Sequence, residues 1–392
     1  MEKLGFKIKE FVKLNKFRPM EINPSIPLEF YQNCPACGLA FKAVCALTSI
    51  KYKNFLRIGC CDFCGHVAYM DRPTQSWISN FYSEEWGDQS FKNLEKRIDK
   101  AKRKVEMSQL MLKMNVTIRL ANKFSEYKEV VVCEIGSGVG QSLRQLSELG
   151  FRNLVGVESS RAQVVVASQG YGMNVLFGDF ESSLVQDQLK NIAPVRMFLA
   201  QHVLEHVTQP DSFFEKISCL QENGDLIILS VPNFAQEAAM GTLLYLPHLH
   251  SFTIKSLNML LNNAGYQIID DSLTTDQYIN VVAKKTGQFP QSETKTGNYF
   301  DKAIMKLKSG LLLKKRLKNL SYYWSWPDYQ NRCEKMVRGG SFKKWLWSTF
   351  SSQWRSTKLR CVLVEPLAIP FVSSPKIPIE VQFEDNIKLW VA

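Results

Sequence analysis

The sequence has no long apolar run, and this absence argues against a protein with membrane-spanning helices. None of its 392 residues lie in a run of eighteen apolar side chains, which is about the length a membrane-crossing helix needs. The first residues also lack the apolar core of a secretory signal, because lysines interrupt them. We therefore expect a cytoplasmic protein whose ten cysteines are metal ligands or buried thiols rather than disulfides.

The glycine-rich turn of the sequence lacks the third glycine of a dinucleotide-binding fingerprint. Residues 130–140 read V-V-V-C-E-I-G-S-G-V-G, an apolar run that ends in Glu134 and a turn. The fingerprint G-x-G-x-x-G would need another glycine where Gln141 stands, so no pyrophosphate site is indicated. A second apolar run, residues 154–157, ends in Glu158. The glycines of the turn are Gly136, Gly138 and Gly140.

This strand–turn–helix–strand pattern suits a ligand with an amino group, a carboxylate and a ribose but no phosphate. Glu134 would orient the ammonium group, and the start of the helix after Gly140 would face the carboxylate. Glu158 would accept hydrogen bonds from both ribose hydroxyls. S-adenosylmethionine has these groups, so we predict it as the cofactor. An ordinary turn, with glycines serving only the backbone angles, is the alternative.

At these residues the chain resembles class I S-adenosylmethionine-dependent methyltransferases, and further matches follow in the family's order over residues 126–286. The resemblance implies that Asp179 receives the adenine amino group and that Gln201 and His202, at the end of the fourth strand, contact the cofactor. Residues 202–206 and the later stretch 248–253 (H-L-H-S-F-T) also resemble family segments. The implied fold is α/β, a Rossmann-like sheet with helices on both faces.

Two C-x-x-C-G knuckles precede this region and predict a zinc ribbon. Four thiolates delivered on two tight turns can surround zinc tetrahedrally, and four ligands leave no open position for substrate, so the metal would be structural. Cys60 could replace its neighbour, but only Cys61 has the two-residue spacing. His66 is then expected near the metal or at the surface, and the remaining cysteines are expected to be buried. The predicted zinc ligands are Cys34, Cys37, Cys61 and Cys64.

The positive charge of the chain is concentrated at its C-terminal end. Residues 287–392 hold eighteen Lys and Arg against eight Asp and Glu, or +10 of the formal +12, and six of the eight tryptophans. Such a region could meet phosphate-bearing partners, namely nucleotide-sugars, nucleic acid or an anionic membrane surface, or could be a solvated basic face. The predicted divisions are a basic amphipathic segment with linker (1–30), the ribbon (31–75), a helical cover (76–125), the methyltransferase domain (126–286) and this region (287–392).

This order of domains resembles that of zinc-ribbon-bearing sugar C-methyltransferases, which act on nucleotide-linked sugars. We therefore expect methyl transfer to a sugar or another small or carrier-linked acceptor. An RNA or protein methyltransferase that docks through the ribbon and the basic region is one alternative, and a non-catalytic interaction protein is another. A hydroxyl or carbon acid needs a base, and histidine is suited to that role near neutral pH. We predict His250 as the base, with His202 or His206 helping to bind the acceptor.

Overall fold

The computed structural model describes residues 12–13, 27–49, 55–85, 93–192, 194–234, 248–288, 358–359 and 387–391. The basic, amphipathic pattern of residues 1–18 predicts a helix. That prediction is wrong at Val12–Lys13, which form strand β1 and pair with β15 (Lys358–Leu359). The rest of residues 1–18 lies outside the described residues, as does nearly all of the basic C-terminal region.

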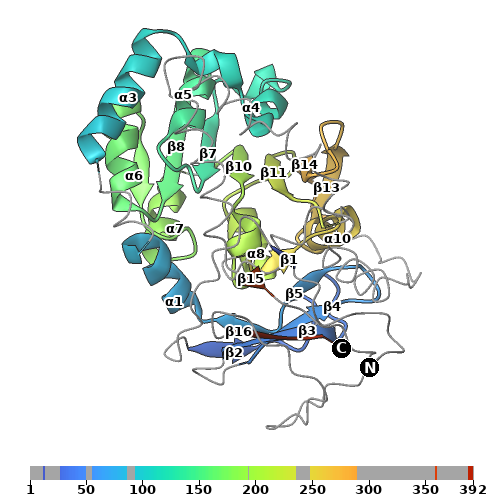
Figure 1. The fold of residues 1–392 in the computed structure, drawn as a ribbon. Coiled ribbons are helices and arrows are strands. Elements are labelled where there is room, and N and C mark those ends of the chain that lie inside the picture. Colours follow the sequence, from blue (N-terminus) through green and yellow to red (C-terminus); the bar gives the residue numbers. More distant parts are fainter. Residues whose placement is uncertain are drawn as a thin grey trace.

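A seven-stranded sheet forms the centre of the fold, and it confirms the predicted α/β class (Figure 1). Its strand order is β13-β14-β11-β10-β7-β8-β9. The strands from β11 to β9 are parallel, whereas β14 runs antiparallel to both of its neighbours. The bounds are β7 (Val131–Ile135), β8 (Asn153–Glu158), β9 (Val175–Phe177), β10 (Met197–Gln201), β11 (Leu226–Pro232), β13 (Tyr266–Asp270) and β14 (Tyr278–Lys285).

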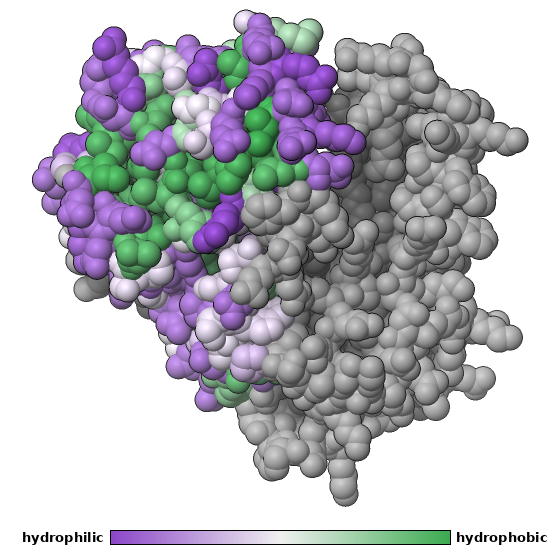
Figure 2. Space-filling model, turned by 90° about the vertical axis from the view of Figure 1, so that its left-hand side faces the viewer, coloured by the Kyte–Doolittle hydropathy of each residue, from purple (hydrophilic) through white to green (hydrophobic). Residues whose placement is uncertain are grey.

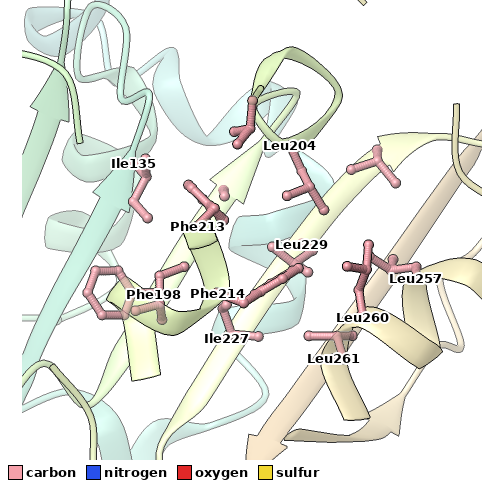
Figure 3. Close-up of a cluster of buried hydrophobic side chains, with 14 of the residues drawn as sticks. Ile135, Phe198, Leu204, Phe213, Phe214, Ile227, Leu229, Leu257, Leu260 and Leu261 are labelled. Carbon is pink, nitrogen blue, oxygen red and sulfur yellow. The ribbon is translucent and has the colours of Figure 1, made fainter. Parts of the chain in front are cut away.

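Buried side chains alternate between the two faces of this sheet, as the pleat of a strand requires. On β10, Phe198 joins one cluster of buried side chains and Leu199 joins another. Figure 3 shows the first cluster, in which side chains of α8 (Pro210–Cys219) and α10 (Ile254–Asn263) meet those of β10 and β11. The second cluster contains residues of α4 (Val116–Ala121) and α5 (Gln141–Glu148). Helices therefore cover both faces.

The two knuckles belong to a separate five-stranded sheet, the ribbon sheet, with the order β12-β5-β4-β3-β16. Its edge strand β12 (His250–Ser251) comes from the segment between the fifth and sixth strands of the large sheet and pairs with β5 (Val67–Tyr69). The other bounds are β3 (Lys42–Ser49), β4 (Phe55–Cys60) and β16 (Ile387–Val391), and β2 (Leu28–Phe30) pairs separately with β6 (Asp71–Pro73). The ribbon sheet thus uses strands encoded far outside residues 31–75.

Short helices connect the ribbon to the large sheet, as the sequence predicts for residues 76–125. They begin with α1 (Gln75–Asn80), which continues into one turn of π-helix, η2 (Phe81–Glu85). The longest is α3 (Leu94–Glu106), which packs with α6 (Arg161–Val166). Figure 2 views the side that carries α1, α3 and α6, where hydrophobic residues form an area bordered by hydrophilic ones. No helix in the described part of the chain combines the length and apolarity that a membrane crossing needs.

Candidate functional site

The glycine turn after β7 brings together the end of β10 and the two acids predicted to bind the cofactor, Glu134 and Glu158. Gly136, Gly138 and Gly140 all have positive φ, between 57° and 75°. A side chain at Gly136 would lie 2.6 Å from a methyl of Val203, so only glycine lets the turn approach the segment that follows β10. Gly140 starts α5, as the sequence predicts.

Glu134 lies beneath this turn with an incompletely satisfied carboxylate. It is 4% exposed, and its Oε2 has no hydrogen-bond partner among the described residues. Burial, together with the charge of nearby Glu158, raises the pKa of Glu134 to about 8, although a hydrogen bond with Ser142 opposes the shift. A buried acid without a full set of partners suits an ammonium group. The site therefore fits the amino end of S-adenosylmethionine.

Glu158 holds the turn and the start of the next helix at once. Its two carboxylate oxygens accept hydrogen bonds from the backbone N–H of Gly138 (2.9 Å) and of Ser160 (2.8 Å). Burial raises the pKa of Glu158, and these backbone donors oppose the shift. Oε2 retains a lone pair, and Oε1 also accepts a long hydrogen bond from Gln163 Nε2 (3.5 Å). The carboxylate can therefore accept from two ribose hydroxyls if one of them replaces Gln163.

Asp179, expected near adenine, contacts a helix that the sequence did not connect with it. One carboxylate oxygen accepts hydrogen bonds from Gln75 Nε2 (2.8 Å) and from the Ser79 hydroxyl, both on α1. The other accepts from the backbone N–H of Glu181 (2.9 Å). In Figure 1, α1 lies between the ribbon strands and α7 (Ser183–Lys190). The acid therefore ties the cover helix to the sheet.

His202 is in an unusual backbone conformation and faces a buried carboxylate. Its φ is +55°, one of three positive values among the described non-glycine residues, and its side chain is 39% exposed. His202 Nδ1 lies 3.2 Å from Glu205 Oε1. Burial alone would raise the pKa of Glu205, but the hydrogen bond with His202 and the nearby imidazoles of His206 and His248 outweigh it and lower that pKa. Strain of this kind is typical of functional positions.

Three further side chains complete a polar cluster at this edge of the sheet. Tyr82 Oη lies 2.8 Å from His206 Nδ1, and the His206 and His248 rings meet edge to face with centroids 4.6 Å apart. Burial lowers the pKa of His248 to about 3, so this ring is neutral near pH 7. Glu205, His206 and His248 place ligand atoms within 4.8 Å of one another, a spacing that also admits a divalent cation. We call Tyr82, His202, Glu205, His206 and His248 the histidine cluster.

Gln201, by contrast, points toward the helical cover. Its Oε1 accepts a hydrogen bond from the hydroxyl of Thr117 on α4, at 3.2 Å. The sequence pattern predicts a contact between Gln201 and the cofactor, and that role stays a prediction.

His250 does not join the histidine cluster. It is 2% exposed on β12, and its Nδ1 lies 2.9 Å from Nε2 of His66 on the ribbon side. Burial, with the positive charge of Arg72 nearby, lowers the pKa of His250 well below its usual value. The surface position allowed for His66 is wrong, because that ring is fully buried against Phe252. The base role of His250 stays a prediction, and its buried position argues against it.

The four knuckle cysteines bring their sulfur atoms together in one cluster. Sγ of Cys34 lies 3.5 Å from that of Cys64, and Sγ of Cys37 lies 3.3 Å from that of Cys61. In a tetrahedron with Zn–S bonds of 2.3 Å the sulfurs stand about 3.8 Å apart, so the cluster is compatible with a structural zinc ion. Cys60 is buried outside the cluster, its thiol 3.7 Å from the Cys61 carbonyl. Cys219 is exposed, contrary to the expectation that the remaining cysteines are buried.

Side chains from both sides fasten the ribbon to the large domain. The Arg72 guanidinium, 1% exposed, donates to the carbonyls of Tyr69 (2.7 Å) and Thr208 (2.8 Å). The Thr253 hydroxyl donates to the carbonyl of Cys64 at 2.9 Å. Thr208 follows His206 by two residues, so the ribbon contacts the segment that carries the histidine cluster.

Comparison with known proteins identifies the central part of the chain. Residues 99–271 match the family described as a methyltransferase domain. No curated protein sequence matches the chain. Among solved structures, the chain is similar to a magnesium protoporphyrin IX methyltransferase from Synechocystis PCC 6803 with bound S-adenosylhomocysteine, at 15% identity over 54% of this chain and 100% of that one, with a TM-score of 0.38. It is also similar to an S-adenosylmethionine-dependent methyltransferase from Archaeoglobus fulgidus, at 18% identity over 43% and 93%, with a TM-score of 0.34.

Proposed function

We propose that this chain, a class I S-adenosylmethionine-dependent methyltransferase through residues 99–271, methylates a hydroxyl-bearing acceptor such as a sugar or another small or carrier-linked molecule. The observation that carries the proposal is the histidine cluster beside the cofactor turn, because its groups can both donate and accept hydrogen bonds. Such groups suit an acceptor with several hydroxyls.

On the cofactor side, we assign each acid a separate part of the ligand. Glu134 binds the ammonium group, Glu158 binds the ribose hydroxyls and Asp179 binds the adenine amino group. When bound, S-adenosylmethionine supplies a methyl group already activated on a sulfonium. The turn at Gly136, which touches Val203, would bring that methyl close to His202. Positioning of the acceptor then accounts for much of the rate.

On the acceptor side, we assign proton removal to His202 and Glu205. The buried carboxylate orients the imidazole through Nδ1 and stabilises the imidazolium that forms when the ring takes a proton. Tyr82 and His206 would then hold the acceptor. In this proposal the base is His202, which is partly exposed, rather than the buried His250.

Calorimetric titration of S-adenosylhomocysteine into the zinc-loaded protein tests the cofactor site. We expect Glu158→Gln to weaken binding about 10- to 100-fold, the value of a hydrogen bond to a charged group. Glu129→Gln, at a residue whose side chain is 68% exposed, is the matched control and should bind like the wild type. If the folded wild-type protein does not bind S-adenosylhomocysteine, the proposed cofactor site is wrong.

Release of S-adenosylhomocysteine during a screen of nucleotide-linked sugars tests the acceptor and the base. With an active acceptor, His202→Gln should lower kcat by about 10²- to 10⁴-fold, the usual contribution of a positioned base, with little change in cofactor affinity. His250→Gln, which alters the contact with His66 of the ribbon, should retain most of kcat if it folds. Full activity of His202→Gln would rule out the assignment.

The same protein can be tested for an RNA acceptor. Binding of RNA that weakens steeply with salt, together with methylation of that RNA, would favour the docking alternative. The proposed divisions of the chain, including a ribbon at residues 31–75, would then describe docking modules around the same catalytic domain.

A further inference from the structure

One short element, residues 75–85, touches both halves of the proposed site. At its start, Gln75 and Ser79 on α1 contact Asp179, the acid assigned to adenine. At its end, Tyr82 on η2 contacts His206 in the histidine cluster. Trp77 and Phe81 stack between these points, with ring centroids 5.5 Å apart, so the element is held as one body.

The Gln75 amide makes hydrogen bonds of opposite kind to two residues outside this element. Its Nε2 donates to Asp179 (2.8 Å), and its Oε1 accepts from the hydroxyl of Thr208. A carboxylate can only accept, so Asp179 fixes which end of the amide faces it. The carbonyl end is then the one that Thr208 must meet, and the Thr208 hydroxyl is oriented in turn.

Thr208 lies on the same segment of the chain as two members of the histidine cluster, Glu205 and His206. It is 3% exposed and lies two residues after His206, and its own carbonyl accepts a hydrogen bond from Arg72 of the ribbon. The segment around Thr208 is therefore held from two sides, by Arg72 through its backbone and by Gln75 through its side chain. Only the second contact leads to the cofactor.

We propose that Gln75 is a positioning residue that couples adenine recognition at Asp179 to the placement of His206 through Thr208. The proposal rests on the proposed function, since it takes Asp179 as the adenine acid. The Asp179 oxygen that faces α1 already accepts two hydrogen bonds, whereas the other accepts one and keeps a lone pair. A bound adenine amino group takes that lone pair or displaces a donor of α1; either change alters the carboxylate that Gln75 contacts and extends through its amide toward the segment of His206.

Nitrogen-15 NMR of the histidine side chains during titration with S-adenosylhomocysteine tests this coupling without an acceptor. The His206 signal is assigned by its loss in His206→Gln. In the wild-type protein we expect saturating S-adenosylhomocysteine to move the His206 signal. In Gln75→Met the affinity should fall about two- to tenfold, as expected for one hydrogen bond, and the movement should disappear.

Two further variants separate the coupling from the contacts on either side. Ser79→Ala removes a neighbouring hydrogen bond to Asp179 and should weaken binding while the His206 signal still moves. Thr208→Val removes only the hydroxyl; it should retain the affinity and lose the movement, and it keeps the test available if Gln75→Met does not fold. A signal that moves in both Gln75→Met and Thr208→Val, or that never moves in the wild type, overturns the proposal. Absence of S-adenosylhomocysteine binding in the wild type would instead overturn the cofactor assignment itself.

Discussion

At the scale of single residues, burial in the folded protein disfavours ionisation of the Glu134 carboxyl group. Its pKa is raised to about 8 in the folded protein, mainly by burial, whereas an exposed glutamate in an unfolded chain titrates near 4.3. Between these two values the folded state binds more protons than the unfolded state. The free energy of unfolding must therefore fall as the pH rises through this window.

Glu134→Gln should remove this pH dependence. The variant has no charge to bury, so its stability relative to the wild type should increase between pH 5.5 and pH 8 by roughly 2–4 kcal/mol. Urea unfolding of both proteins at the two pH values measures the difference, and all other titrating groups cancel in the comparison. An equal difference at the two pH values would show that Glu134 is ionised throughout.

The residues that we propose to bind the cofactor stand out in the sequence because Glu134, the glycines and Glu158 are close together in the chain. Glu134 and the glycines share one turn, and Glu158 ends the next strand. The histidine cluster could not be predicted in this way, because Tyr82, His206 and His248 come from three distant segments. His250 looked equivalent to His248 in the H-x-H stretch. What separates them is the pairing of β12 with β5, a contact that the local sequence does not encode.

At the scale of elements, α10 begins with a cap that also binds the ribbon. Thr253 accepts a hydrogen bond from the backbone N–H of Ser256, and the Ser256 hydroxyl accepts one from the backbone N–H of Thr253, which makes a capping box. The Thr253 hydroxyl also donates to the Cys64 carbonyl. One hydroxyl therefore fastens the start of a helix to a zinc knuckle.

Thr253→Ala should lower the free energy of unfolding by about 1–2 kcal/mol, since it removes both the cap and the bond to the knuckle. Thr253→Ser retains the hydroxyl and should recover most of this loss. Thermal or denaturant unfolding of the three proteins makes the comparison. Equal stability of the alanine and serine variants would mean that the hydroxyl contributes nothing.

The zinc knuckles lead to a prediction about metal content. Cys61→Ser should lose bound zinc, because it removes one of four converging thiolates, and the ribbon should become less stable. Cys60→Ser changes the adjacent cysteine, which lies outside the cluster, and should keep one zinc ion per chain. Elemental analysis of the purified proteins gives the answer, and the reverse result would assign the ligand to Cys60.

Strands of the large sheet could be predicted from local sequence patterns, whereas the arrangement of the ribbon sheet could not. Apolar runs that end in an acid predicted β7 and β8, because each pattern is contained within one segment. Strand β12 has two residues, too few for a pattern. It is a strand because β5 offers an unpaired edge, and such long-range pairing lies outside what a local reading can detect.

At the scale of the whole molecule, the chain passes repeatedly between the two sheets. It builds β3 to β5, continues into the large sheet, returns for β12 and then adds β13 and β14 to the large sheet. The side chain of Phe252, directly after β12, is fully buried, and it touches His66 of the ribbon. The ribbon and the catalytic domain are therefore parts of one folding unit.

Removal of residues 1–74 should consequently damage the catalytic domain. The truncated chain would expose Phe252 and leave β12 without its partner β5. We expect aggregation or a strongly lowered melting temperature compared with the full chain at the same concentration. A truncated protein that stays monomeric and binds S-adenosylhomocysteine like the full chain would show that the ribbon is dispensable for folding.

During synthesis of the chain, β12 is made much later than β5, the strand with which it pairs. It is encoded about 180 residues after β5, and a ribosome adds about 5–20 residues per second. During synthesis the edge of β5 would thus wait roughly 10–40 seconds for its partner strand. Throughout that interval the edge of β5 is unpaired and the four thiols lie near it, so early capture of zinc would protect the nascent chain against both mispairing and oxidation.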